Sequence, residues 1–138
     1  MTVRNETIGT YTGVVCNCSS KNQLVNIKAL SLDMRIENDI LSSIKKTIKS
    51  IDPSATVILY GSVARGDNRP DSDIDLLILV DKEMLSPVDK KKLKYPLYEI
   101  EFETGQIISP LVLSRSDWES RHKITPFYEN VNSEGVTL

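Results

Sequence analysis

The first long pattern along the chain is that of an amphipathic helix. Between Asp33 and Ser50, apolar residues recur every three or four positions, with acidic residues near the start and lysines near the end. That spacing and that charge order both favour a helix, and Asp52-Pro53 would end it. The apolar residues of the predicted helix are Ile36, Ile40, Leu41, Ile44 and Ile48.

Two short apolar runs follow, with a polar stretch between them. Residues 55–60 and 73–80 are rich in aliphatic side chains and predict two buried strands. Between these runs, residues 62–65 predict the start of a short helix. Residues 67–72 combine Asp, Asn, Pro and Ser and predict a loop rich in turns.

Residues 86–105 fit two different elements. In the second half of this segment, apolar and aromatic residues alternate with glutamates, which is typical of a strand. Leu93, Leu97 and Ile100 instead recur at helical spacing, and Gly105 would end such a helix. We favour the helix.

The remaining segments are shorter. Residues 107–113 predict a third strand, and the proline within it favours a sheet edge or a bulge. The pattern Ser116-x-x-Glu119 is a capping box and would open a short helix. Thr125-Pro126 would open another helix that runs to about Asn132.

The N-terminal segment differs from the rest of the chain. Residues 1–32 are dense in polar residues and show no lasting periodicity, so we expect a poorly ordered extension, with one folded domain over 33–138. Met34 could alternatively be the natural start. Cys16 and Cys18 lie in the extension, and we expect two free thiols because a metal site needs about four ligands.

Composition narrows the class of protein. A length of 138 residues suits one domain. The net charge of −2, from 17 basic and 19 acidic residues, gives no general reason to expect tight non-specific binding of nucleic acid. No apolar run approaches the roughly 20 residues needed to cross a bilayer, and no secretory signal is visible. We therefore expect a cytoplasmic protein without a membrane partner.

The candidate chemistry lies between the first two predicted strands. Gly61-Ser62 precedes Asp73-x-Asp75 with ten residues between them. A glycine there permits a sharp turn close to a ligand, and the following amides and the Ser62 hydroxyl would hold phosphate oxygens. Asp73 and Asp75 would share one strand face, where two carboxylates can hold divalent cations beside phosphates. Arg65 would either neutralise the charge of a phosphate or of the acceptor, or be a solvated helix residue.

The segment from Gly61 to Asp75 resembles the Gly-Ser-x10-Asp-x-Asp signature of the DNA polymerase beta-like nucleotidyltransferase superfamily. The size of the chain is similar to that of the small stand-alone members, the antitoxin-like minimal nucleotidyltransferases. The resemblance implies an α/β (α+β) fold with a small mixed β-sheet and flanking helices over 33–138. It also implies that Gly61 and Ser62 hold the triphosphate, and that Asp73 and Asp75 bind two Mg²⁺ ions.

The reaction that the resemblance implies moves a nucleoside monophosphate, AMP from ATP, to an acceptor hydroxyl. A chain this short has no second domain for a large acceptor, so we expect a partner protein to be the acceptor or to supply it. The resemblance implies a helical HEPN-type toxin, neutralised by AMPylation or by binding. A nucleic acid acceptor is not indicated.

The superfamily usually has a third carboxylate on the strand that follows the Asp-x-Asp strand. If residues 86–105 form a strand, Glu99 or Glu101 would supply it; if they form a helix, Ser109 stands at its place. A missing third carboxylate would leave nucleotide binding but slow transfer. The alternative hypothesis is therefore a weak or inactive antitoxin or scaffold that acts by binding its partner.

Overall fold

The structure is a computed structural model that describes residues 38–138. The predicted extension over 1–32, the alternative start at Met34 and the thiols of Cys16 and Cys18 lie outside the described residues. Among the described helices, none is long and apolar enough to cross a membrane.

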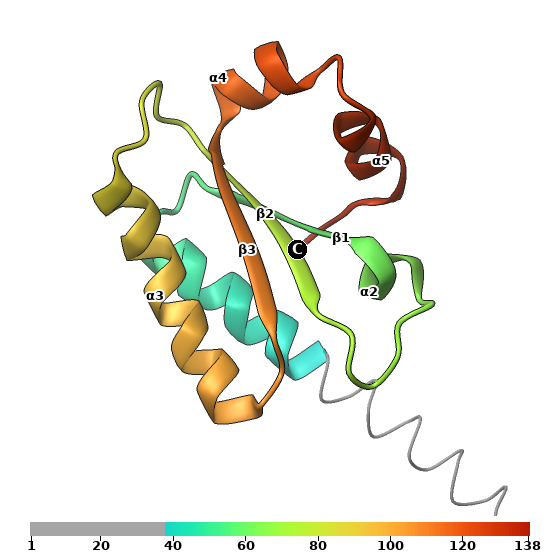
Figure 1. Ribbon diagram of the computed structural model, residues 1–138. Helices are drawn as coiled ribbons and strands as arrows, with labels where there is room; N and C mark the ends of the chain where they lie inside the picture. Colours follow the sequence, from blue (N-terminus) through green and yellow to red (C-terminus); the bar gives the residue numbers. More distant parts are fainter. Residues whose placement is uncertain (1–37) are drawn as a thin grey trace, which may run out of the picture.

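A four-stranded sheet forms the centre of the fold (Figure 1). Its spatial order is β3-β2-β1-β4; β1 pairs antiparallel with β2 and β4, whereas β2 and β3 are parallel. The sheet is therefore mixed, as predicted, and β3 with its proline lies at an edge. The strands are β1 (Thr56–Tyr60), β2 (Ile74–Val80), β3 (Ile108–Ser114) and β4 (Val136–Thr137).

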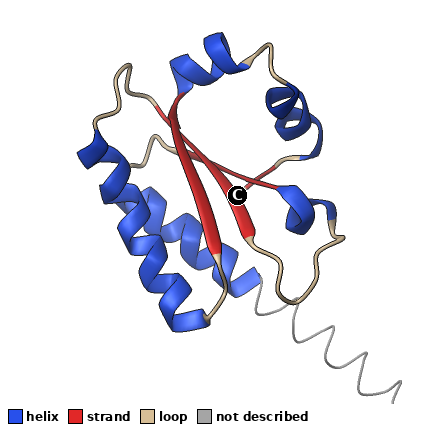
Figure 2. Ribbon diagram, in the orientation of Figure 1, coloured by secondary structure: helices blue, strands red, loops and turns tan. Residues whose placement is uncertain are grey.

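Helices connect the strands and cover both faces of the sheet (Figure 2). The first helix spans residues 38–51 of the described chain. The ambiguous segment 86–105 is helical, so the favoured interpretation is confirmed and the strand alternative is wrong. The later helices are α2 (Gly61–Arg65), α3 (Pro87–Thr104), α4 (Arg115–Asp117), the π-helical turn η1 (Trp118–His122) and α5 (Pro126–Glu134).

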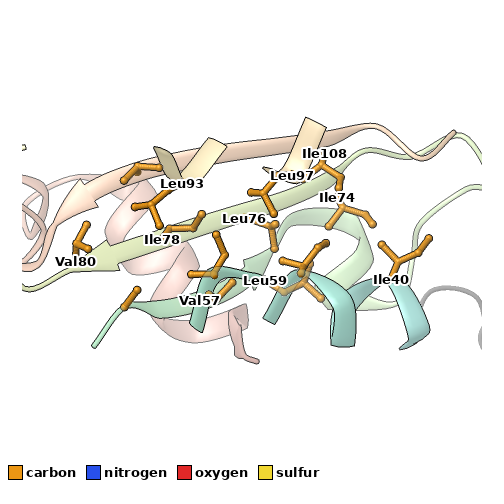
Figure 3. Packing of buried hydrophobic residues seen from close by; sticks show 14 residues of the cluster. Ile40, Val57, Leu59, Ile74, Leu76, Ile78, Val80, Leu93, Leu97 and Ile108 are labelled. Atoms are coloured by element: carbon orange, nitrogen blue, oxygen red, sulfur yellow. The ribbon is translucent and has the colours of Figure 1, made fainter. Parts of the chain in front are cut away.

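Side chains of β2 enter two separate cores on opposite faces of the sheet. The even-numbered residues from Ile74 to Val80 are buried against the first helix and α3 (Figure 3). Leu77 and Leu79 are buried on the other face, with residues of η1 and α5. Because alternate residues of a strand point to opposite faces, Asp75 lies on the face that the C-terminal helices cover. Ile74 points into the first core, as predicted.

Two predictions about the C-terminal region need correction. The capping box at Ser116 is wrong, because the Ser114 side chain accepts the hydrogen bond from Asp117 N at 3.0 Å and caps α4. The strand runs directly into the helix at Ser114, so the helical turn begins before Ser116 can cap it. Thr125 caps α5 as predicted, and the helix ends near the predicted residue, at Glu134 before Gly135. The second correction is β4, which follows the helix where no strand was predicted.

The N-terminus of α3 carries a charged cap that depends on pH. Ser86 and Asp89 form a capping box, and Lys82 Nζ donates to Asp89 Oδ1 at 2.7 Å. The hydrogen bond from Lys82, followed by those from Ser86, lowers the pKa of Asp89 from 3.8 to about 2. Since the folded pKa is depressed, the stabilisation is fully present above the ordinary pKa and is lost as the pH falls through about 2.

We therefore expect Asp89→Asn to lower the melting temperature at neutral pH and to have little effect at about pH 2. Thermal unfolding of both proteins across this pH range measures the difference. A difference in melting temperature that stays constant down to about pH 2 would show that the charge of Asp89 contributes nothing.

Candidate functional site

A left-handed glycine joins β1 to α2 and brings two distant parts of the sequence together. Gly61 has a φ of +78°, a backbone conformation that costs other residues about 1–2 kcal/mol. A Cβ atom at this position would lie 2.5 Å from Asp75 Oδ2. The turn therefore needs glycine for its backbone angle and for space, and the carboxylate of Asp75 lies directly against it.

The two carboxylates of the Asp-x-Asp motif influence each other. Asp73 is exposed and precedes β2 by one residue, whereas Asp75 is half-buried within β2. Burial, followed by the nearby charge of Asp73, raises the pKa of Asp75. The ionised form of Asp75 is thus disfavoured in the folded protein, and a bound cation would relieve both causes.

The start of α2 offers donors that the described residues leave unused. No side chain within residues 38–138 caps the helix at Tyr60. The Ser62 hydroxyl has no hydrogen-bond partner among residues 38–138. The backbone amides that follow Gly61 and the Ser62 hydroxyl therefore lie on the same turn that contacts Asp75.

The loop between α2 and β2 is anchored at its far end. Ser72 Oγ accepts from Arg69 N at 2.8 Å, and Ser72 N donates back to Arg69 O at 2.9 Å. Gln106 Nε2 donates to Ser72 O, and Ile74 N donates to Ile107 O. These bonds tie the residues on either side of Asp73 to the segment that leads into β3.

Arg65 is held by two carboxylates. Its Nε lies 3.3 Å from Asp67 Oδ2, and its Nη1 lies 3.2 Å from Glu134 Oε2 at the end of α5. The hydrogen bond to Glu134, followed by that to Asp67, raises the pKa of Arg65. A phosphate group that approached Arg65 would therefore compete with these two partners.

Ser109 stands beside Asp75 in the sheet. The parallel register of β2 and β3 places Asp75 opposite Ser109, and both residues belong to the face that the C-terminal helices cover. Glu99 and Glu101 lie instead on α3, which packs against the opposite face. The strand next to Asp75 thus carries a serine at the position where the superfamily usually has its third carboxylate.

Tyr60 is a neighbour of the site that lies outside the segment from Gly61 to Asp75. It lies opposite Asp75 in the register of β1 and β2, and its ring packs edge-on against Phe127 with centroids 5.3 Å apart. Burial, followed by the charge of Asp75, raises the pKa of the Tyr60 hydroxyl. Its position immediately before Gly61 was the available signal, because the last residue of that strand must border the turn.

Residues 41–121 match the nucleotidyltransferase domain family. This range is more than half of the chain and contains the whole segment from Gly61 to Asp75. The chain belongs to the nucleotidyltransferase family. Membership confirms the predicted superfamily and the enzyme class, and it agrees with the mixed sheet and flanking helices described above.

A curated relative of this nucleotidyltransferase comes from Methanocaldococcus jannaschii. The protein, named "Putative protein adenylyltransferase MJ0141", is 35% identical over 102 residues, which are 72% of this chain and 96% of the relative. A solved structure described as a toxin-antitoxin with AMP-PNP is 19% identical, with a TM-score of 0.48 over 73% of this chain and 70% of that one. That likeness is too distant to carry a function across.

The carboxylates of this nucleotidyltransferase fit a divalent cation that shares its ligands with a substrate. Within residues 38–138, no group of three or more His, Cys, Asp or Glu side chains could hold a metal alone. Mg²⁺ is typically held by one or two carboxylates together with substrate phosphates. The pair Asp73 and Asp75, with the raised pKa of Asp75, suits such a shared site.

Proposed function

We propose that this nucleotidyltransferase moves AMP from ATP to a hydroxyl group of a partner protein in the cytoplasm. The observation that carries the proposal is the contact between the Gly61 turn and the Asp75 carboxylate. It joins a candidate phosphate-binding turn and a candidate metal ligand in one site. The name of the archaeal relative, a protein adenylyltransferase, supports adenylate as the group and protein as the acceptor.

In this proposal each residue has a separate task. The triphosphate is held by Gly61, Ser62 and the amides after them. Arg65 neutralises part of the charge of the triphosphate after it exchanges a carboxylate partner for a phosphate. Asp73 and Asp75 hold two Mg²⁺ ions, which would neutralise charge on the phosphates. The acceptor oxygen attacks the α-phosphorus, the bond from that phosphorus to the β-phosphate oxygen breaks, and pyrophosphate leaves while the proton of the acceptor hydroxyl passes to solvent.

The acceptor hydroxyl is the least defined part of the reaction. Residues 38–138 form a single sheet with its covering helices and include no separate substrate domain, so a partner protein is the simplest source of the hydroxyl. The family resemblance favours a helical HEPN-type toxin as that partner, and adenylylation would then neutralise it.

The test is transfer of label from ATP. The protein is incubated with Mg²⁺ and ATP labelled in the α-phosphate, in the presence of lysate from its own source, and proteins are separated on a denaturing gel. We expect a labelled band that needs Mg²⁺ and is absent when the label is in the γ-phosphate. Labelling from the γ-phosphate but not from the α-phosphate would indicate phosphorylation and contradict the proposal.

Ser109 favours a second candidate function. A serine beside Asp75 removes the carboxylate that would help to deprotonate the acceptor. The chain would then bind nucleotide and partner but transfer slowly or not at all, acting as an antitoxin by complex formation. A stable complex with the partner and no label transfer would support this candidate.

Ser109→Asp separates the two functions. If the missing carboxylate limits transfer, the substitution should raise the rate by roughly tenfold or more, since a positioned base contributes at least that much. The rate of AMP incorporation measures the effect, and Ser109→Asn is the control of similar size without charge. An equal effect of Asp and Asn would show that the charge at this position is irrelevant.

A further inference from the structure

The outward face of α3 carries large apolar side chains that the rest of the described chain, residues 38–138, leaves uncovered. Val88, Tyr95 and Phe102 are 60%, 60% and 92% exposed, and Tyr98, which meets Tyr95 edge-on, is 46% exposed. Steps of three, four and seven residues place these side chains on one side of the helix, opposite the buried Leu97. A hollow of about 350 Å³ lies among the aromatic rings and two neighbouring glutamates.

The charges along α3 are divided between its two halves. The lysines lie before Tyr95 and the glutamates after it. Lys91 and Glu99 flank the apolar residues, and neither has an ion-pair partner among residues 38–138. We call this surface the α3 stripe; it consists of Val88, Lys91, Lys92, Tyr95, Tyr98, Glu99 and Phe102.

We propose that the α3 stripe is the interface of a homodimer, in which α3 packs antiparallel against α3 of a second copy. With a two-fold axis at Tyr95, positions equally far before and after Tyr95 face each other. Val88 then meets Phe102 of the second copy, and Lys91 meets Glu99. Each contact occurs twice, as two-fold symmetry requires.

A second copy fits this surface because the stripe is complementary to itself. Reversing the direction of α3 exchanges its basic half for its acidic half while leaving aromatic residues in the centre.

Exposed apolar side chains are not a general property of the helices on this face of the sheet, as the neighbouring helix shows. The first helix covers the same face of the sheet as α3 (Figure 1). The residues in the middle of its outward face are polar and exposed: Ser42, Ser43, Lys45 and Lys46. An exposed apolar patch with a polar rim, by contrast, marks an interaction site.

Sedimentation velocity of the full chain over a dilution series tests the proposal. We expect a monomer–dimer equilibrium in the unmodified protein. Lys91→Glu should weaken dimerisation by roughly tenfold or more, because it places like charges opposite each other twice. Glu99→Lys should do the same. A mixture of the two variants should restore a dimer, since the introduced glutamate of one chain would then meet the introduced lysine of the other.

Lys46→Glu is the matched control, because it makes the same charge change on the exposed face of the first helix. It should leave the dimer unchanged, and all variants should keep the melting temperature of the monomer, since these side chains are exposed. A protein that stays monomeric at every concentration would overturn the proposal. A dimer that Lys91→Glu does not weaken, or that mixing does not restore, would overturn it as well.

Discussion

Asp75→Asn should abolish AMP transfer while leaving the protein folded and more resistant to heat. Charge neutralisation by bound metal contributes several kcal/mol to a transition state, so losing a metal ligand should slow transfer on the order of 100-fold or more. The folded protein meanwhile disfavours an ionised Asp75, because burial and the charge of Asp73 raise its pKa. A neutral asparagine removes that cost.

The effect of Asp75→Asn on the melting temperature depends on pH. Because the folded pKa of Asp75 is raised, ionisation destabilises the fold at neutral pH, and this penalty disappears as the pH falls below the ordinary value. Without metal, the melting temperature of Asp75→Asn should therefore exceed that of the unmodified protein at pH 7 but not at about pH 3. Glu83→Gln, at an exposed position in the loop between β2 and α3, is the control and should change neither property. Transfer in Asp75→Asn at the rate of the unmodified protein would contradict the role of this carboxylate.

Gly61→Ala should also eliminate transfer, and by a different route. The added Cβ atom would lie 2.5 Å from Asp75 Oδ2, so either the turn or the carboxylate must shift. The left-handed backbone adds strain of about 1–2 kcal/mol. We therefore expect a lower melting temperature, weaker binding of metal and nucleotide, and a loss of transfer comparable to that of Asp75→Asn.

Gly105→Ala is the matched control for backbone strain. Gly105 has a φ of +72° at the end of α3, and a Cβ atom there would meet nothing within 4 Å. This variant should lower the melting temperature through the same backbone strain while keeping normal transfer. If both variants transferred label equally well, the contact between Gly61 and Asp75 would have no role in the reaction.

Most of the fold could be predicted because its elements depend on local patterns. The helix that ends near Asp52, the buried strands on either side of the Gly61 turn and the cap at Thr125 follow from periodicity and end signals. Residues 86–105 showed both the alternation of a strand and the spacing of a helix. The helix prevails there because Leu93 and Leu97 together cover the core face of β2.

Features set by tertiary contacts could not be predicted in the same way. β4 is a two-residue strand that forms by pairing with β1, and two residues are too few to carry a signal of their own. Ser114 and Ser116 are equally good caps in sequence, and only the end of β3 decides between them. Tyr60 lies opposite Asp75 because of the antiparallel register of β1 and β2. Ser109 was expected beside the site only if residues 86–105 formed a helix, and the parallel register of β2 and β3 places it there.

A crystal structure with Mn²⁺ and a non-hydrolysable ATP analogue tests the central claim most directly. Anomalous scattering at the manganese edge locates the metal without ambiguity. We predict manganese between the carboxylates of Asp73 and Asp75, with the triphosphate against Ser62 and the amides after Gly61. Metal or nucleotide bound elsewhere, with the two carboxylates empty, would contradict the account.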